Sequence, residues 1–241
     1  MGIFDRFGKD KPGKEVPEKE VSPGGSVIHR YSSDQWAQTQ VGFIEKAGEY
    51  GKLRDAVYER RFGQPKLVWH EPIPLVPHID VMEYYRTSEN GQVCVLVTSG
   101  MSNLPMRLPA KAEAPRRVEI IFYCTEPKRE YIETMRYLAH FPHDQKTWIG
   151  AFHTIPNGNP PEPLWGTAMD TFFFLPPIVR KDTTLREDLI LDDDPVEFLW
   201  LVPLTSAECK LKLAKGSKAI LDLFQSHRHP HIFDPARKSY A

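Results

Sequence analysis

Residues 93–106 read Val-Cys-Val-Leu-Val-Thr-Ser-Gly-Met-Ser-Asn-Leu-Pro-Met. The stretch from Val93 to Val97 is a continuous apolar run, which is typical of a central β-strand buried on both faces. The run ends where hydroxyl side chains can bond to neighbouring backbone, glycine permits an unusual dihedral and proline fixes the exit. We therefore predict that a core strand closes in a structural turn made by Thr98, Ser99, Gly100, Met101 and Pro105.

Helical and strand patterns alternate irregularly around this stretch. We expect further strands over 66–70, 79–85, 118–124, 148–155, 171–175 and 196–204. Helical spacing predicts a helix that begins near Ser33 and others over 53–62, 128–141 and 206–227, the last with Ser206 as a candidate N-cap. This order indicates an α+β fold, a mixed α/β arrangement in which helices pack on a central mixed or largely antiparallel sheet.

The 241 residues fit one large domain preceded by a loose end. Residues 9–25 are rich in Lys, Glu, Pro and Gly, so they offer little apolar surface to offset the entropy of ordering. We predict a flexible leader over 1–25 and a single domain over 26–241.

Charge and composition disfavour several classes of partner. The 31 basic and 32 acidic residues nearly cancel, whereas nucleic-acid binders usually carry a net basic face. No stretch approaches the roughly 18 apolar residues of a membrane helix, and the amino terminus lacks a signal-peptide pattern. Cys94, Cys124 and Cys209 are widely spaced, as in buried reduced thiols. We expect a cytoplasmic protein with no nucleic-acid or membrane partner.

Motifs for catalysis are missing from the sequence. It contains neither GxxxxGK[ST] nor GxGxxG, and Val97 stands where the hydrolase pattern GxSxG around Ser99 would need glycine. His78 and Asp80 are two apart on an expected strand, and we interpret them as a hydrogen-bonded pair. We therefore predict no enzymatic activity and no cofactor.

One alternative uses histidine. His140, His143, Asp144 and His153 could ligate a metal in a metal-dependent hydrolase, although no zinc motif fixes their spacing. We prefer a structural interpretation, in which a helix end that favours histidine explains the first two and His153 is a strand residue bonded to a loop.

Two loops are candidates for contact with a partner. The acidic turn Asp192-Asp193-Asp194 could steer a basic protein, and the proline-rich loop 156–163 offers Asn157 and Asn159 as candidate contact residues. A solvated turn is the alternative interpretation of the three aspartates.

Several segments, in order, resemble the suppressor-of-fused domain family. They are YERRFGQP at 58–65, PHIDV at 77–81, CVLVTSGMSNLPM at 94–106, VEII at 118–121, HT at 153–154, VPL at 202–204 with Glu208, and FDPARKS at 233–239. One departure is Phe152, where the family pattern has glycine before the histidine of HT.

The resemblance implies a mixed α/β domain with a central sheet and no known enzymatic activity. Animal members are longer, cytoplasmic regulators that sequester transcription factors in Hedgehog signalling, and bacterial relatives include immunity proteins against polymorphic toxins. We therefore expect a protein-binding module that sequesters or inhibits a partner, such as a toxin domain. A scaffold subunit of a larger assembly is the alternative.

Overall fold

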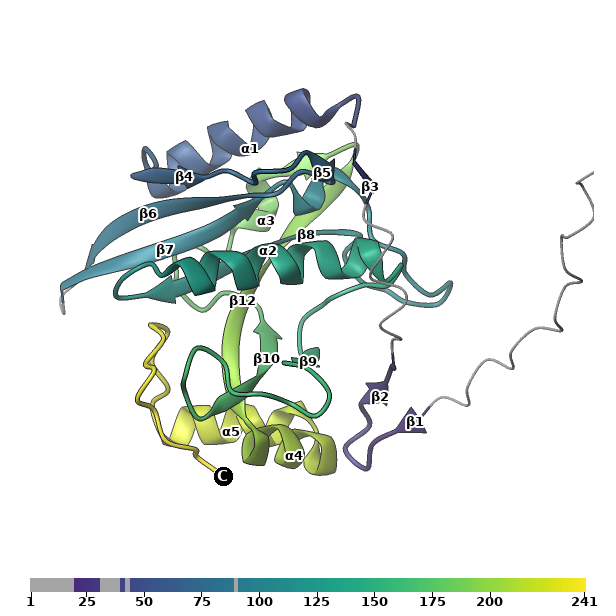
Figure 1. Ribbon diagram of the computed structural model, residues 1–241, viewed down its shortest axis with the longest axis vertical. Helices are drawn as coiled ribbons and strands as arrows, with labels where there is room; N and C mark the ends of the chain where they lie inside the picture. The colour runs from purple at the N-terminus through teal and green to yellow at the C-terminus, as the bar shows by residue number, and fades with distance from the viewer. Residues whose placement is uncertain (1–19, 31–39, 42–43, 89–90) are drawn as a thin grey trace, which may run out of the picture.

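The computed structural model describes residues 20–30, 40–41, 44–88 and 91–241. Its centre is an eight-stranded sheet with the order β4-β6-β7-β8-β12-β10-β9, and β11 pairs with the start of β12 (Figure 1). These strands are β4 (Leu67–Trp69), β6 (Asp80–Ser88), β7 (Gly91–Ser99), β8 (Arg117–Cys124), β9 (Thr154–Pro156), β10 (Met169–Leu175), β11 (Ile190–Leu191) and β12 (Asp194–Thr205).

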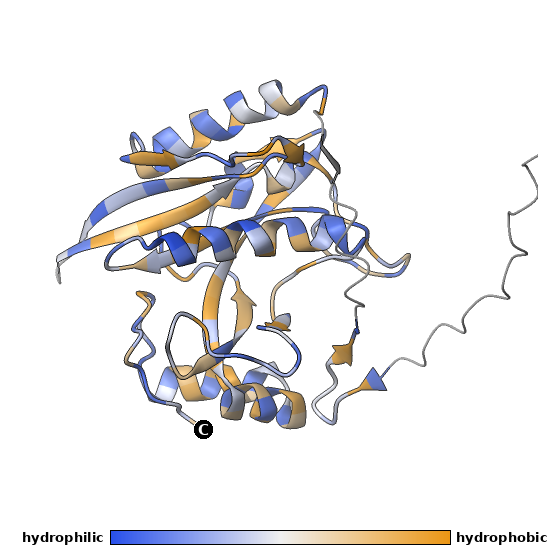
Figure 2. Ribbon diagram, viewed as in Figure 1, coloured by the Kyte–Doolittle hydropathy of each residue, from blue (hydrophilic) through white to orange (hydrophobic). Residues whose placement is uncertain are grey.

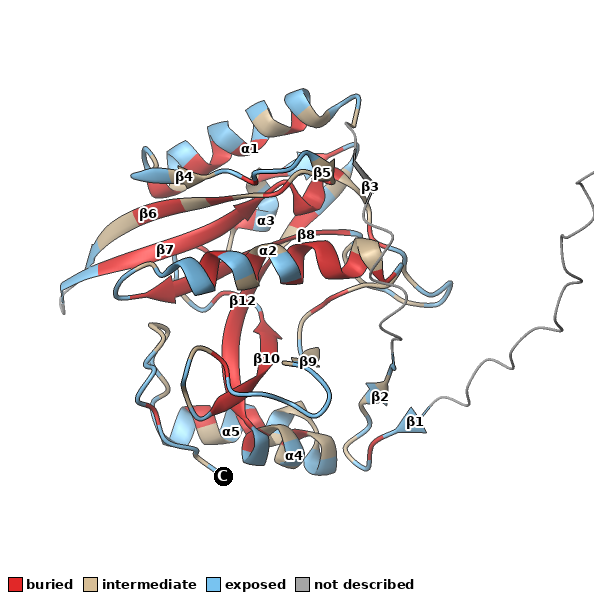
Figure 3. Cartoon of the chain, viewed as in Figure 1, coloured by how far each residue is buried: buried red, intermediate tan, exposed pale blue. Residues whose placement is uncertain are grey.

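The sheet is mixed, because β8 and β12 pair in parallel while the other neighbours pair in antiparallel fashion. β7 lies between β6 and β8 and is buried from Val93 to Ser99, as the apolar run predicts (Figures 2 and 3). The predicted α+β fold with a largely antiparallel mixed sheet is confirmed.

Helices cover both faces of the sheet. Alternation along β7 sends Val93, Val95 and Val97 to the face covered by α1 (Ala47–Phe62), α3 (Leu185–Asp188) and α5 (Ser217–Ser226). Cys94 and Leu96 face the opposite side, which α2 (Arg129–Asp144) covers. Each face therefore has its own apolar core, and none of the helices in the described ranges is long and apolar enough to cross a membrane.

Three predicted element boundaries are wrong for local reasons. The expected helix 128–141 ends before Pro142, whereas α2 continues through Pro142 to Asp144. Pro142 stands in the last turn, where its missing N–H removes only one hydrogen bond. Of the expected strand 148–155, only Thr154 and Ile155 pair with β10, because Phe152 has a positive φ of 70° and turns the chain. The carboxy-terminal helix is two helices, α4 (Ser206–Lys215) and α5, which separate at Gly216 with φ 85°.

Two other boundaries also differ. α4 is capped by Thr205 rather than Ser206, because Thr205 and Glu208 form a reciprocal capping box. α1 starts at Ala47, six residues before the expected helix 53–62, and contains Gly48 and Gly51. The expected N-cap at Ser33 lies outside the described residues.

The described part of the amino-terminal region forms small two-stranded sheets. β1 (Glu20–Val21) pairs with β2 (Val27–Ile28), and β3 (Gln40–Val41) pairs with β5 (Leu75–Val76). The N–H of Gly24 donates to the carbonyl of Leu213 at 2.7 Å, which docks the β1–β2 hairpin on α4. The predicted boundary after residue 25 falls inside this hairpin, and residues 1–19 of the predicted leader lie outside the described ranges.

Candidate functional site

The turn after β7 packs tightly against the start of β6. Gly100 has φ 129°, and a Cβ atom there would lie 2.0 Å from the carbonyl oxygen of His78. Only glycine fits this position without a backbone shift. A short 3-10 helix, η2 (Met101–Asn103), follows and is buried.

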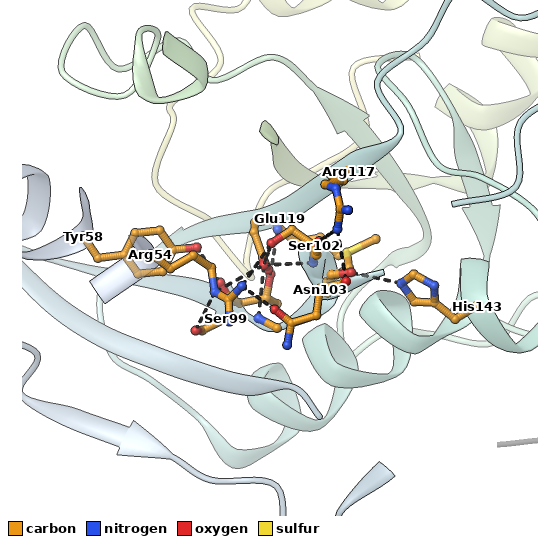
Figure 4. Close-up of polar contacts among 12 residues, drawn as sticks. Arg54, Tyr58, Ser99, Ser102, Asn103, Arg117, Glu119 and His143 are labelled. Atoms are coloured by element: carbon orange, nitrogen blue, oxygen red, sulfur yellow. Dashed lines mark hydrogen bonds and ion pairs between the residues drawn. The ribbon is translucent and has the colours of Figure 1, made fainter. Parts of the chain in front are cut away.

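Glu119 of β8 holds this turn from beneath (Figure 4). Its carboxylate is fully buried and accepts from the hydroxyls of Thr98 and Ser102, each at 2.6 Å. It also accepts from the backbone N–H groups of Gly100 at 3.1 Å and Ser102 at 3.0 Å. Four donors to one carboxylate fix the turn in a single conformation.

Arg54 joins α1 to the same network. Its guanidinium is buried and donates to Ser99 Oγ at 3.1 Å and to Asn103 Oδ1 at 2.5 Å. Its Nε lies 3.9 Å from Glu119 Oε1, so the buried carboxylate has a compensating charge. We call the set Arg54, Thr98, Ser99, Gly100, Ser102, Asn103 and Glu119 the Glu119 clamp. Every hydroxyl and carboxylate in it is buried and has an internal partner, so the network holds the turn in place.

Arg117 connects the clamp to the acidic turn. It donates to the carbonyls of Ser102 at 2.7 Å and Asn103 at 3.0 Å, and its other end lies 3.3 Å from Asp192 and 3.6 Å from Asp194. The structure therefore places two regions that the sequence singled out, the turn after β7 and the acidic turn, side by side.

The three aspartates differ in their environment. Asp192 accepts from Lys46 Nζ at 2.8 Å and from the Tyr50 hydroxyl, and Asp194 lies 3.6 Å from Arg116. Asp192 and Asp193 both have positive φ and form the tight turn that joins β11 to β12. Asp193 is exposed at its tip, so it is the aspartate best placed to contact another molecule.

The second predicted loop lies at the other end of β12. Asn157 bonds to Asp170 and Glu162 within its own region, while Asn159 is exposed. Asn157 bonds to Asp170, whose neighbour Met169 pairs with Thr205 at the end of β12, whereas Asp194 of the acidic turn is the first residue of β12. At about 3.3 Å per residue, the two ends of β12 are roughly 35 Å apart. The structure does not bring the two predicted loops into one small site.

The metal-binding alternative is not supported by the geometry. His140 Nε2 lies 2.6 Å from Glu71, His143 Nε2 lies 3.1 Å from the Met101 carbonyl, and His153 Nδ1 accepts from Gly150. Among the described residues, no group of three His, Cys, Asp or Glu side chains is placed to hold a metal ion.

The structure shows a series of contacts between histidine and carboxylate side chains that the sequence did not reveal. Asp80 lies between His70 at 3.0 Å and His78 at 3.2 Å, so the predicted His78–Asp80 contact is present. Glu71 extends this series, since it lies 3.5 Å from His78 and 2.6 Å from His140. These residues tie the 70–80 segment to α2 beside Gly100, and the long-range partner His140 could not be found from local spacing.

His143 gives the fold a measurable pH dependence. Burial lowers the pKa of His143 to about 4, from 6.5 in the unfolded chain. Between these values the unfolded chain binds a proton that the folded chain excludes, so stability falls as pH falls from 6.5 towards 4. We expect His143 alone to cost about 2 kcal/mol between pH 7 and pH 5. Urea unfolding at both pH values should show this difference shrinking in His143→Gln, and an unchanged difference would contradict it.

A second buried ion pair closes the carboxy-terminal end. Glu208, which caps α4, accepts from Arg237 at 2.6 and 2.9 Å and from the Tyr240 N–H at 3.0 Å. Arg237 also donates to the Pro203 carbonyl at 3.1 Å. We call the Glu208–Arg237 pair the terminal clamp. It unites two of the segments that carried the family resemblance, VPL with Glu208 and FDPARKS.

Comparisons with known proteins agree with this architecture. The sequence model of the suppressor of fused protein (SUFU) family matches residues 76–238, and no curated protein matches the chain. A SUFU homologue from Neisseria gonorrhoeae FA 1090 is similar in structure, with a TM-score of 0.60 and 17% identity over 80% of this chain and 98% of that one.

Two further solved structures share the fold. A chain of the Sufu–Fu complex has a TM-score of 0.53 and 10% identity over 80% of this chain and 91% of its own. Drosophila Suppressor of Fused has a TM-score of 0.52 and 10% identity, over 78% of this chain and 50% of its own. The family match spans well over half of the sequence and contains both clamps except Arg54, so the chain belongs to the suppressor of fused protein (SUFU) family.

Proposed function

We propose that this chain is a non-enzymatic protein-binding module that sequesters or inhibits a partner in the cytoplasm, with residues 26–241 acting as one domain. The observation that carries the proposal is the Glu119 clamp, in which each polar side chain of the segment 94–106, one of those that carry the family resemblance, is used to hold the fold. The structure of a family member in the Sufu–Fu complex supports a protein as the partner.

We further propose that the partner is a toxin domain and that the chain is its immunity protein. The test is co-expression with a toxin encoded beside its gene in a toxin-sensitive host. Restored growth, together with a one-to-one complex of the two purified proteins, is the expected result. Cell death despite soluble expression of both proteins would overturn the immunity role.

Asp193, exposed in the turn before β12, is our proposed steering residue. Lys46, Arg116 and Arg117 already balance Asp192 and Asp194, whereas Asp193 is exposed and has no cation within 4.0 Å among the described residues. We expect Asp193→Lys to slow association with a basic partner by about tenfold at low salt and to change dissociation little.

Stopped-flow association kinetics measure this effect. Glu126→Lys is the matched control, since it makes the same charge change at an exposed position after β8. Equal association rates for the parent chain and Asp193→Lys would remove the acidic turn from the proposed contact surface. Asn159→Ala tests the other loop in the same assay.

A further inference from the structure

A cavity of about 290 Å³ opens on the α1 face of the sheet. It is lined by the ends of β6, β7 and β8, by the segment 179–181 and by His231. Its size is near the lower limit of small-molecule sites, which begin at about 300 Å³. None of its lining residues belongs to the Glu119 clamp or to the two loops proposed for partner contact.

The floor of the cavity is apolar. Val93 and Val95 line it and are almost fully buried, and Val179 adds a partly buried wall. The ring of Tyr123 is also buried, and its hydroxyl donates to Asp182 at 2.6 Å. The inner part of the cavity therefore suits a hydrocarbon group rather than a polar one.

The carboxylate that bonds two of the lining residues, Arg86 and Tyr123, is already neutralised. Asp182 is buried and receives two hydrogen bonds from Arg86, each of 2.6 Å, in addition to the one from Tyr123. This bidentate pair uses both carboxylate oxygens. Asp182 thus supplies the cavity with no free negative charge.

Two cations on the wall remain uncompensated. Arg180 and Lys181 are exposed lining residues, and no carboxylate in the described ranges lies within 4.0 Å of either side chain's charged group. Nearby arginines are paired, since Arg61 contacts Asp188 and Arg186 lies 3.3 Å from Glu197. The cavity therefore combines an apolar floor with a local positive charge at its wall.

We propose that this cavity binds a carboxylate carried on an apolar stem, with the stem on the valines and the carboxylate at Arg180 and Lys181. A space of this size holds on the order of ten water-sized groups, which corresponds to a medium-chain acid. The carboxylate could belong to a free acid or to the apolar carboxy terminus of another protein. The proposal does not depend on the proposed partner-binding function.

Isothermal titration of the full chain with octanoate tests the proposal. We expect octanoate to bind, while octanol and octylamine, which share its stem, bind at least about tenfold more weakly because octanol is neutral and octylamine is a cation. The double variant Arg180→Ala/Lys181→Ala should lose at least about tenfold in octanoate affinity. Lys210→Ala/Lys215→Ala on α4 is the control and should bind as the parent chain does.

Two further measurements separate the remaining outcomes. Val179→Trp should abolish octanoate binding by filling the cavity while leaving both cations in place. N-acetyl-Leu-Leu with a free carboxylate, compared with its amide, distinguishes the sources, since tighter binding of this peptide than of octanoate indicates a protein terminus. Equal binding of octanoate and octanol, parent-like affinity in Arg180→Ala/Lys181→Ala, or no binding of either acid would overturn the proposal.

Discussion

Glu119→Ala should lower the free energy of unfolding by about 3–5 kcal/mol, because it leaves the buried Arg54 guanidinium without its anion. The substitution also removes the acceptor of the Thr98 and Ser102 hydroxyls and of two backbone N–H groups around Gly100. Unsatisfied buried donors add to the cost. Urea unfolding followed by tryptophan fluorescence measures the effect.

Glu119→Gln separates charge from shape in this experiment. Glutamine keeps one acceptor oxygen, so we expect a smaller loss than in Glu119→Ala, with Arg54 still uncompensated. Glu126→Ala, an exposed carboxylate after β8, is the control and should change stability by less than about 0.5 kcal/mol. A Glu119→Ala protein as stable as this control would show that the Glu119 clamp does not hold the turn.

Arg237→Met should have the second-largest effect, about 3–5 kcal/mol, because it leaves the buried Glu208 carboxylate without its cation. Arg237 lowers the pKa of Glu208 against the raising effect of burial, which is the larger single influence. The stability that comes from this lowered pKa is present above the usual range of glutamate and is lost as pH falls through the folded value. The variant should therefore lose its stability difference from the parent chain at acidic pH.

The same variant should loosen the carboxy-terminal segment. Hydrogen exchange of residues 233–241 reports this directly, since Tyr240 donates its N–H to Glu208. The double variant Glu208→Gln/Arg237→Met should be more stable than the sum of the single losses, because neither charge is left unpaired. Lys238→Ala, exposed beside Arg237, is the control. Strictly additive losses, with unchanged exchange at Tyr240, would contradict the terminal clamp.

Local sequence was sufficient to predict the central strand and its turn. The apolar run from Val93 and the turn at Gly100 depend only on residues next to each other in the chain. The structure has β7 and η2 at these positions. The clamp beneath the turn could not be predicted in the same way. It depends on the pairing of β7 with β8, which brings Glu119 within hydrogen-bonding distance of Thr98.

The candidate contact residues show the same limit. The run of aspartates and the proline that follows predict an acidic turn at 192–194. That Lys46 and Arg117 balance two of the three charges depends on α1 and β8, which are distant in the chain. Histidine spacing was misleading about a metal site for the same reason, because His140 contacts Glu71 of the 70–80 segment rather than His153.

The most direct test of the proposed function is affinity capture of the tagged full chain from a lysate of its native cells, with a binding titration of whatever protein is retained. We predict one stoichiometric protein partner with a dissociation constant in the nanomolar range, retained equally by the control Glu126→Lys and less by Asp193→Lys. A chain that is folded by its unfolding curve yet retains no protein above background would contradict the account of a protein-binding module.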